Sequence, residues 1–415
     1  MTKALGPSTH SITLNDNTIV HYRLQGLNNN DNVGDDNTNI ERWTQFCSSV
    51  FSYKPSPPPP SYFARHFYND PRCDAALVRV MIHCPDRPLS NDDTELQKGE
   101  IVSSVRIFRR TLSTGGTTTL EAGGIGEVCT SPNHQRRGLS KLLLKNAIDI
   151  MSSSSVGGGK DGGESGGMMV CSLLHANPDF RPVYHKVGGY ESVSSKWSLV
   201  PIALNKLAMN SNEEIGEGWT TRQAVFPQDV PQLKALYTEY SEKRMITIVR
   251  STEYWTNYVS AELGDTLWVL EDDNAMIVAW LSIRKRGGRY QLREFGVDRQ
   301  KKCYVHSDIT TVALSRLLSV ALQQVGEDVT SENDEKISLL MPTVILSDMQ
   351  ENVDGATGQV GEEVGNTLFN VDDVVEENDD GWMYVSFDES APSVLELAMR
   401  SNDPIPHLIW PTDSF

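Results

Sequence analysis

The residues best suited to chemistry in this sequence form a short cationic turn, Gln135-Arg136-Arg137-Gly138. The turn follows Ser131-Pro132, where a strand must end because proline has no backbone N–H for the ladder. From Leu139 onward, apolar residues recur with the spacing of one helix face. The first amides of a helix have no intrahelical acceptors and lie at the positive end of its dipole, so the turn is suited to bind a phosphate group. Gly138 removes a side chain where such a group would approach the backbone.

A second segment downstream holds residues suited to proton transfer. Residues 177–190 read NPDFRPVYHKVGGY, with Asn177 seven residues before Tyr184. We expect a short helix near Asp179–Val187 and a strand that starts at Tyr190. A tyrosine hydroxyl, with an ordinary pKa of about 10, is protonated at neutral pH and can donate to a leaving thiolate.

The two segments together resemble the GNAT superfamily of N-acetyltransferases. Gln135–Ser140 is similar to the coenzyme A signature [Q/R]-x-x-G-x-[G/A], with Ser140 in the place of the last small residue. Residues 177–190 are similar to the pattern N-x-x-A-x-x-F/L-Y-x-K-x-G-F/Y of the same superfamily. The resemblance implies acetyl-CoA as the coenzyme. The residues that it places at the coenzyme are Val128, Cys129, Thr130, Gln135, Arg136, Arg137, Gly138, Leu139, Ser140, Lys141 and Asn177.

The resemblance also implies catalytic roles. Tyr184 would lie beside the coenzyme sulfur as the general acid, and a backbone N–H near Cys129 would polarise the thioester carbonyl. Two carboxylates remain open as the general base. Glu127 is close on the central strand, although at another phase from the glutamate of protein-lysine acetyltransferases. Tandem GNAT enzymes, the N-myristoyltransferases and the enhanced-intracellular-survival (Eis) type, use the C-terminal carboxylate, which belongs here to Phe415.

The order of elements predicts an α/β protein with mixed sheets, built as two tandem GNAT-like domains of residues 1–203 and 217–415. The first pass ends with a strand over Tyr190–Val200, and the second ends with strands over Met383–Phe387 and His407–Trp410. The second domain has no glycine between Val297 and Val325, so we expect it to bind no coenzyme. The whole arrangement resembles the Eis-type acetyltransferases.

Three low-complexity segments interrupt these elements, and we expect them to be disordered loops. They are residues 28–39, 152–167 and the acidic stretch 348–381. The formal net charge of the chain is −18, and 11 of these negative charges come from Asp348–Asp380, which has no Lys or Arg. Such an acidic chain is poorly suited to bind nucleic acid.

Other features limit the location and the cofactors of the protein. The 6 cysteines include no CxxC pair and no cluster with His, so we expect reduced thiols and no metal site. There is no apolar run of about 18 residues and no apolar signal segment at the N-terminus. We therefore expect a cytoplasmic protein that does not contact membranes.

These observations predict an N-acetyltransferase that acts on an amine by direct attack on the thioester of acetyl-CoA. Two alternatives stay open, which are transfer of a longer acyl chain and a non-catalytic acyl-CoA-binding regulatory role. The acceptor, a small-molecule amine or a protein amine, is not readable from the sequence. His66 and His175 are candidates to face the acceptor pocket, and a homo-oligomer is compatible with the sequence.

Overall fold

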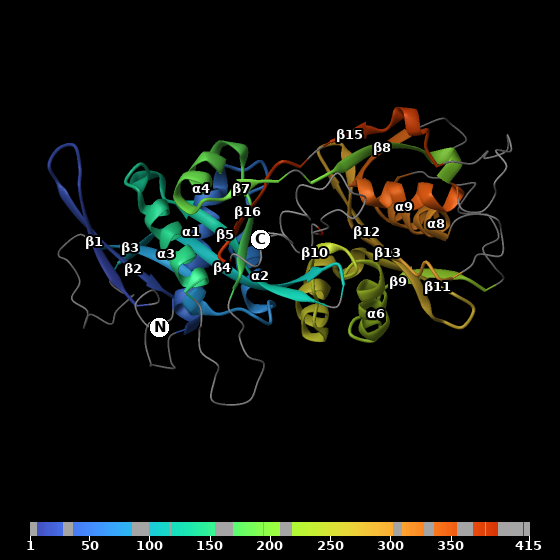
Figure 1. Ribbon diagram of the computed structural model, residues 1–415, viewed down its shortest axis with the longest axis horizontal. Helices are drawn as coiled ribbons and strands as arrows, with labels where there is room; N and C mark the ends of the chain where they lie inside the picture. The colour runs from blue at the N-terminus through green and yellow to red at the C-terminus, as the bar shows by residue number, and fades with distance from the viewer. Residues whose placement is uncertain are drawn as a thin grey trace.

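The computed structural model describes most of the chain and places it in two mixed β-sheets that lie side by side (Figure 1). The described residues are 6–27, 36–84, 99–116, 118–153, 169–193, 195–207, 218–301, 309–327, 336–354, 368–377, 379–388 and 410. The expected α/β architecture with two related halves is confirmed.

The first sheet has the spatial order β1-β2-β3-β4-β5-β6-β16-β7, and β10 pairs with one end of β4. Only the β5–β6 pair is parallel among the described strands of this sheet. Its strands are β1 (Ser8–Thr13), β2 (Ile19–Gly26), β3 (Val78–Cys84), β4 (Glu100–Thr114), β5 (Thr119–Thr130), β6 (Cys171–His175), β7 (Glu191–Ser192), β10 (Met245–Ile248) and β16 (Trp382–Ser386).

Helices cover both faces of the first sheet, because consecutive strand residues point to opposite sides. Val80 and Ile82 pack with helices α1 and α2, whereas Met81 packs with α3 and α4. The bounds are α1 (Asp36–Val50), α2 (Pro60–Tyr68), α3 (Leu139–Ser152) and α4 (Arg181–Gly188). The helices expected at Leu139 and near Tyr184 are therefore present.

The second sheet repeats the plan, with the order β15-β8-β14-β13-β12-β11-β9 and a parallel β13–β14 pair. Its strands are β8 (Trp197–Ala203), β9 (Thr220–Gln223), β11 (Leu267–Glu271), β12 (Ile277–Arg286), β13 (Arg289–Val297), β14 (Lys336–Pro342) and β15 (Val375–Glu376). The helices are α6 (Val230–Tyr240), the π-helical turn η6 (Tyr254–Val259), α7 (Ser260–Leu263), α8 (Ile309–Gln324) and α9 (Thr343–Asp354).

The two sheets exchange strands. β8, expected to close the first half, pairs antiparallel with β14 in the second sheet. β16, expected in the second half, lies between β6 and β7 in the first sheet (Figure 1). β10 also crosses over, with Met245 opposite Thr114 of β4. The ladder hydrogen bonds of each sheet thus depend on residues from both halves of the sequence, which alternation of elements along the chain does not reveal.

Two segments expected in loops begin or end in regular structure. α1 starts at Asp36, so the last residues of 28–39 are helical. α9 continues to Asp354 and β15 lies at Val375–Glu376, both within the acidic stretch. Most of 152–167 lies outside the described residues.

The 5 cysteines of the described part have free thiols, and no helix there is long and apolar enough to cross a membrane.

Candidate active site

The cationic turn forms the start of α3. Arg136 and Gly138 both have left-handed backbones, with φ of 61° and 76°. Gly138 is the N-cap and supplies no side-chain cap, and the first backbone bond of the helix joins the amide of Leu142 to its carbonyl. Three amides at positions 139–141 therefore have no recorded acceptor among the described residues. Amides grouped by left-handed residues form concavities that bind anions.

The space in front of this turn is open. A Cβ built on Gly138 would meet no atom within 4 Å. The side chains of Arg136 and Lys141 are exposed there, whereas Arg137 turns back to the protein. Its guanidinium donates to Tyr22 Oη at 2.6 Å and to the Asn133 carbonyl at 2.8 Å. Arg137 thus holds the turn in place, and Arg136 is the arginine free to meet a ligand.

The two parallel strands below the turn separate. β5 and β6 pair from Ala122 opposite Cys171 to Ile125 opposite Leu174. β5 continues to Thr130 and pairs with β4 on its other side, with Cys129 opposite Ser104. On the β6 side, no described strand pairs with β5 after Ile125. The edge that includes residues 128–130 is therefore available to an extended ligand.

A β-bulge lies at the point of separation. Gly126 is opposite Arg106 and Cys129 is opposite Ser104, so two residues of β5 face one residue of β4. The bulge residue Glu127 has a positive φ of 45°. Val128 packs on the α3 side and Cys129 on the α1 side. The extra residue changes the alternation of the strand, and Glu127 interacts with His66 of α2.

The Glu127 carboxylate is buried and weakly paired. Its side chain is 7% exposed, and Arg106 Nη1 lies 3.7 Å from Oε1. Oε2 has no hydrogen-bond partner. Burial raises the pKa of Glu127, although the charges of Arg106 and His66 oppose the shift. Glu127 is therefore a stronger base than an ordinary carboxylate.

Tyr184 projects from α4 toward the same strand. It is half-buried, and its hydroxyl has no recorded hydrogen bond among the described residues. Its ring packs against Tyr190 at 6.3 Å between centroids. Burial raises the pKa of Tyr184 to about 12, and the nearby Cys129 adds to the shift. This free hydroxyl lies close to β5, as the assigned role requires.

Asn177 caps the helical turn before α4. Its side-chain oxygen accepts a hydrogen bond from the amide of Asp179 at 3.0 Å. His175, four residues after the start of β6, is exposed and pairs with Asp379 at 2.8 Å.

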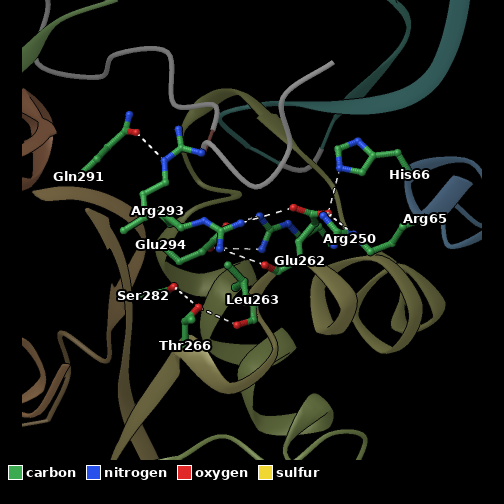
Figure 2. Close-up of polar contacts among 11 residues, drawn as sticks. Arg65, His66, Arg250, Glu262, Leu263, Thr266, Ser282, Gln291, Arg293 and Glu294 are labelled. Atoms are coloured by element: carbon green, nitrogen blue, oxygen red, sulfur yellow. Dashed lines mark hydrogen bonds and ion pairs between the residues drawn. The ribbon is translucent and has the colours of Figure 1, made fainter. Parts of the chain in front are cut away.

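A second group of side chains lies on α2 and α7, and of its members sequence reasoning named only His66. Glu262 Oε1 lies 2.9 Å from both Arg65 and His66, and Oε2 lies 3.4 Å from Arg293 (Figure 2). Tyr62 stacks on His66 at 4.2 Å between centroids. Burial raises the pKa of Tyr62 to about 12, with contributions from Glu127 and Glu262. The four-residue spacing of Tyr62 and His66 places both on one helix face and was the available signal.

The C-terminal base candidate cannot be placed. Phe415 lies outside the described residues, as does most of the expected strand 407–410. Trp410 is fully buried in the core of the second sheet, where its indole Nε1 lies 3.2 Å from Ser241 Oγ.

The second sheet has a corresponding but altered site. β13 and β14 pair only at Tyr290 and Gln291 and then separate. A cavity of about 1000 Å³ lies between α6, residues 297–301 and α9. Asp348 lines this cavity, and its Oδ2 accepts hydrogen bonds from Tyr240 Oη at 2.9 Å and from Arg244 Nη2 at 2.6 Å. Charged side chains of the protein thus occupy the region that corresponds to the coenzyme edge of the first sheet.

One group of side chains has the chemistry of a metal site. Ligand atoms of His83, Glu100 and His134 lie within 4.8 Å of one another. Tetrahedral zinc with bonds of about 2.0 Å needs ligand atoms about 3.3 Å apart. Arg137 also lies 3.3 Å from His134 Nδ1. The three ligand atoms would have to move closer together beside the Arg137 guanidinium, so their present arrangement does not fit a metal ion.

Comparisons with known proteins identify a domain match and similar folds. Residues 36–157 match the family model of the acetyltransferase (GNAT) domain. No curated protein sequence matches the chain. A probable N-acyltransferase from Enterococcus faecalis V583 is 12% identical, covers 88% of this chain and 73% of its own, and has a TM-score of 0.53. A GCN5-related N-acetyltransferase from Anabaena variabilis has 12% identity, the same coverages of 88% and 73%, and a TM-score of 0.51.

Eis1 from Mycobacterium abscessus aligns at 12% identity over 90% of this chain and 76% of its own. Its TM-score of 0.49 is too low to support an argument. The expected resemblance to the GNAT superfamily is confirmed by the match of residues 36–157 to the acetyltransferase (GNAT) domain model. A domain of this kind supports acyl-CoA-dependent acyl transfer as the general class of reaction.

Proposed function

We propose that the protein is an acetyl-CoA-dependent N-acetyltransferase with its reaction centre at the bulge of β5. The observation that carries the proposal is a continuous set of unsatisfied groups. The free amides at the start of α3 suit a diphosphate, the separated edge of β5 suits a pantetheine arm, and the free hydroxyl of Tyr184 lies near Cys129. The coenzyme would supply an activated acetyl thioester, from which an amine displaces the thiol.

Tyr184 keeps its proton throughout the physiological pH range. Because its pKa of about 12 exceeds the value of about 8.5 for a thiol, complete proton transfer to a thiolate would be uphill. We infer that the hydroxyl stabilises negative charge on the leaving sulfur mainly as a hydrogen-bond donor. A positioned donor of this kind contributes about 10²–10⁴-fold to the rate.

Glu127 is the described residue best suited to accept the proton of the attacking amine. An alkylammonium with a pKa of about 10.4 is almost entirely charged at neutral pH, so a base is needed. Burial raises the pKa of Glu127, and Oε2 is unpaired. The carboxylate of Phe415 remains the competing proposal, and Glu127→Gln distinguishes the two because it should spare turnover if Phe415 is the base.

The test is release of coenzyme A thiol from acetyl-CoA with a panel of amines. Tyr184→Phe should lower kcat by about 10²–10⁴-fold and leave the coenzyme Kd nearly unchanged. Tyr68→Phe is the matched control, because Tyr68 is 54% exposed. Full activity of Tyr184→Phe would contradict its role.

The alternative of a longer acyl chain is tested in the same assay with octanoyl-CoA and myristoyl-CoA. A lower KM for these than for acetyl-CoA would replace the acetyl assignment. Coenzyme binding without thiol release for any amine would instead favour the non-catalytic role.

A further inference from the structure

At the interface between the two halves, three basic side chains share one carboxylate. Glu262 is the central carboxylate, but Arg65, His66 and Arg293 already share its two oxygens (Figure 2). Its side chain is only 11% exposed, so it has little surface for a further partner. An additional cation at this interface must therefore find its anion elsewhere.

Arg284 of β12 is such a cation. Its side chain is half-buried, and Nε donates to Gln291 Oε1 at 2.8 Å. No other acceptor is recorded for its guanidinium within the described part of the chain. Arg222 in the same sheet shows the usual arrangement, because Asp229 at 2.6 Å and Glu271 at 2.5 Å both bind it.

The surroundings of Arg284 are unfavourable to its charge. Burial and the nearby Arg293 and Arg286 lower its pKa to about 10, and the weaker attraction of Tyr62 and Glu262 does not offset them. Burial and Arg286 likewise lower the pKa of Lys54. A half-buried cation among like charges destabilises the protein unless an anion joins it. A guanidinium matches planar oxyanions through two parallel hydrogen bonds.

Arg284 also lies near the reaction centre. Arg284 lies opposite Gln291 on β13, and Arg293, two residues further on, reaches Glu262. The same carboxylate binds His66, whose ring packs against Tyr62 and whose carbonyl accepts a hydrogen bond from Arg106, 3.7 Å from Glu127. The Tyr62 hydroxyl has no recorded partner in the described ranges. An acceptor that presents its amine to Glu127 would therefore direct its opposite end across Tyr62 toward Arg284.

We propose that the acceptor amine also carries an oxyanion, a carboxylate or a phosphate, which the guanidinium of Arg284 binds at the interface between the two sheets. The proposal rests on the proposed function for its amine, but the anion site is a property of the resting protein. Arg284 is a specificity-determining residue, and Tyr62 forms the wall between its site and Glu127.

The kinetic test compares paired acceptors with acetyl-CoA: 4-aminobutyrate against n-butylamine, and phosphoethanolamine against ethanolamine. The wild type should have a KM about tenfold or more lower for one anionic member of a pair, as one charged hydrogen-bonded contact allows. Arg284→Met should remove this preference with little change in kcat. Arg286→Met, at an exposed neighbouring position, should retain it. Equal KM values within both pairs, or a preference that survives Arg284→Met, would overturn the proposal.

A binding test needs no turnover. Glutarate or inorganic phosphate should raise the Tm of the wild type and of Arg286→Met, but not that of Arg284→Met. Arg284→Met should fold, because it removes an unpaired charge. Arg284→Lys keeps the charge without the planar fork and should give a smaller shift.

The outcomes separate the two proposals. An Arg284-dependent anion shift without acetylation of any amine would support the anion site and contradict the proposed function. Acetylation without preference or shift would support the function and contradict the anion site.

Discussion

Each sheet contains a bulge at the strand that leads toward its central helix, and the two bulges hold opposite charges. In β5 the bulge contains Glu127, whose Oε2 is unpaired. In β13, Leu292 is opposite Ile283 and Glu294 is opposite Ser282, so Arg293 is the extra residue. Arg293 donates to the Glu262 carbonyl at 2.9 Å.

The comparison indicates that the same backbone feature, a β-bulge, serves two different purposes in the two sheets. Both bulges redirect a charged side chain toward the interface between the halves. The first leaves its carboxylate with an uncommitted oxygen, beside separated strands and a helix start with free amides. The second commits its guanidinium to a protein carboxylate, and the matching cavity contains the paired Asp348. We interpret the first bulge as chemical and the second as structural.

The largest expected effect is on kcat and comes from removing the carboxylate of the first bulge. Glu127→Gln should lower kcat by about 10²–10⁴-fold with little change in coenzyme Kd, because it removes the general base. Arg293→Gln is the counterpart and should leave kcat nearly unchanged, because Arg293 is bound to Glu262 and takes no part in the proposed proton transfer. Steady-state kinetics on both variants checks this. Similar kcat losses in the two variants would remove the distinction between the bulges.

The next effect is on stability and tests the structural assignment of the second bulge. Next to it, Glu294 and Arg250 pair at 2.6 Å with both side chains 0% exposed. Arg250→Met leaves a buried carboxylate and should lower the free energy of unfolding by about 3–5 kcal/mol. Arg289→Met is the control, since its pair with Glu377 is 38% and 39% exposed and should contribute about 1 kcal/mol or less. Denaturant titration measures both, and equal losses would contradict the assignment.

A third comparison concerns the glycines near the two central helices. Gly138 before α3 and Gly326 after α8 have φ of 76° and 85°, and a Cβ on either meets nothing within 4 Å. Alanine at each should cost about 1–3 kcal/mol of stability from backbone strain. Only Gly138→Ala should also weaken coenzyme binding in calorimetry, because only its Cβ enters the space before the free amides. Equal coenzyme affinity in both variants would speak against the phosphate site.

The smallest effect is the pH dependence of stability. Because burial raises the pKa of Glu127 above its unfolded value of 4.5, the folded state holds this proton more tightly. The Tm of the wild type relative to Glu127→Gln should be highest below pH 4.5 and should decrease as the pH rises through the raised pKa. The rate of acetylation should instead increase as the pH rises through this pKa, since the base must be ionised. A Tm difference that is constant with pH would mean that the pKa is not shifted.

The sequence alone was enough to predict the local parts of this site. The start of α3 follows from the spacing of apolar residues after Gly138, and its free amides follow from helix geometry. Asn177 and Tyr184 could be placed because their spacing belongs to one short helical segment. These features depend on interactions between residues close in the chain, for which the sequence is a sufficient record.

Only the tertiary structure decided the rest. The direction of Glu127 depends on a bulge set by the register between β4 and β5, which strand alternation does not predict. The exchange of β8 and β16 depends on which sheet offers a free edge to each strand. Glu262 meets His66, which lies 196 positions earlier in the chain, and Arg284 lacks an anion because of how the two halves pack. Such contacts join distant residues, and their energies depend on burial and distance, which no local pattern records.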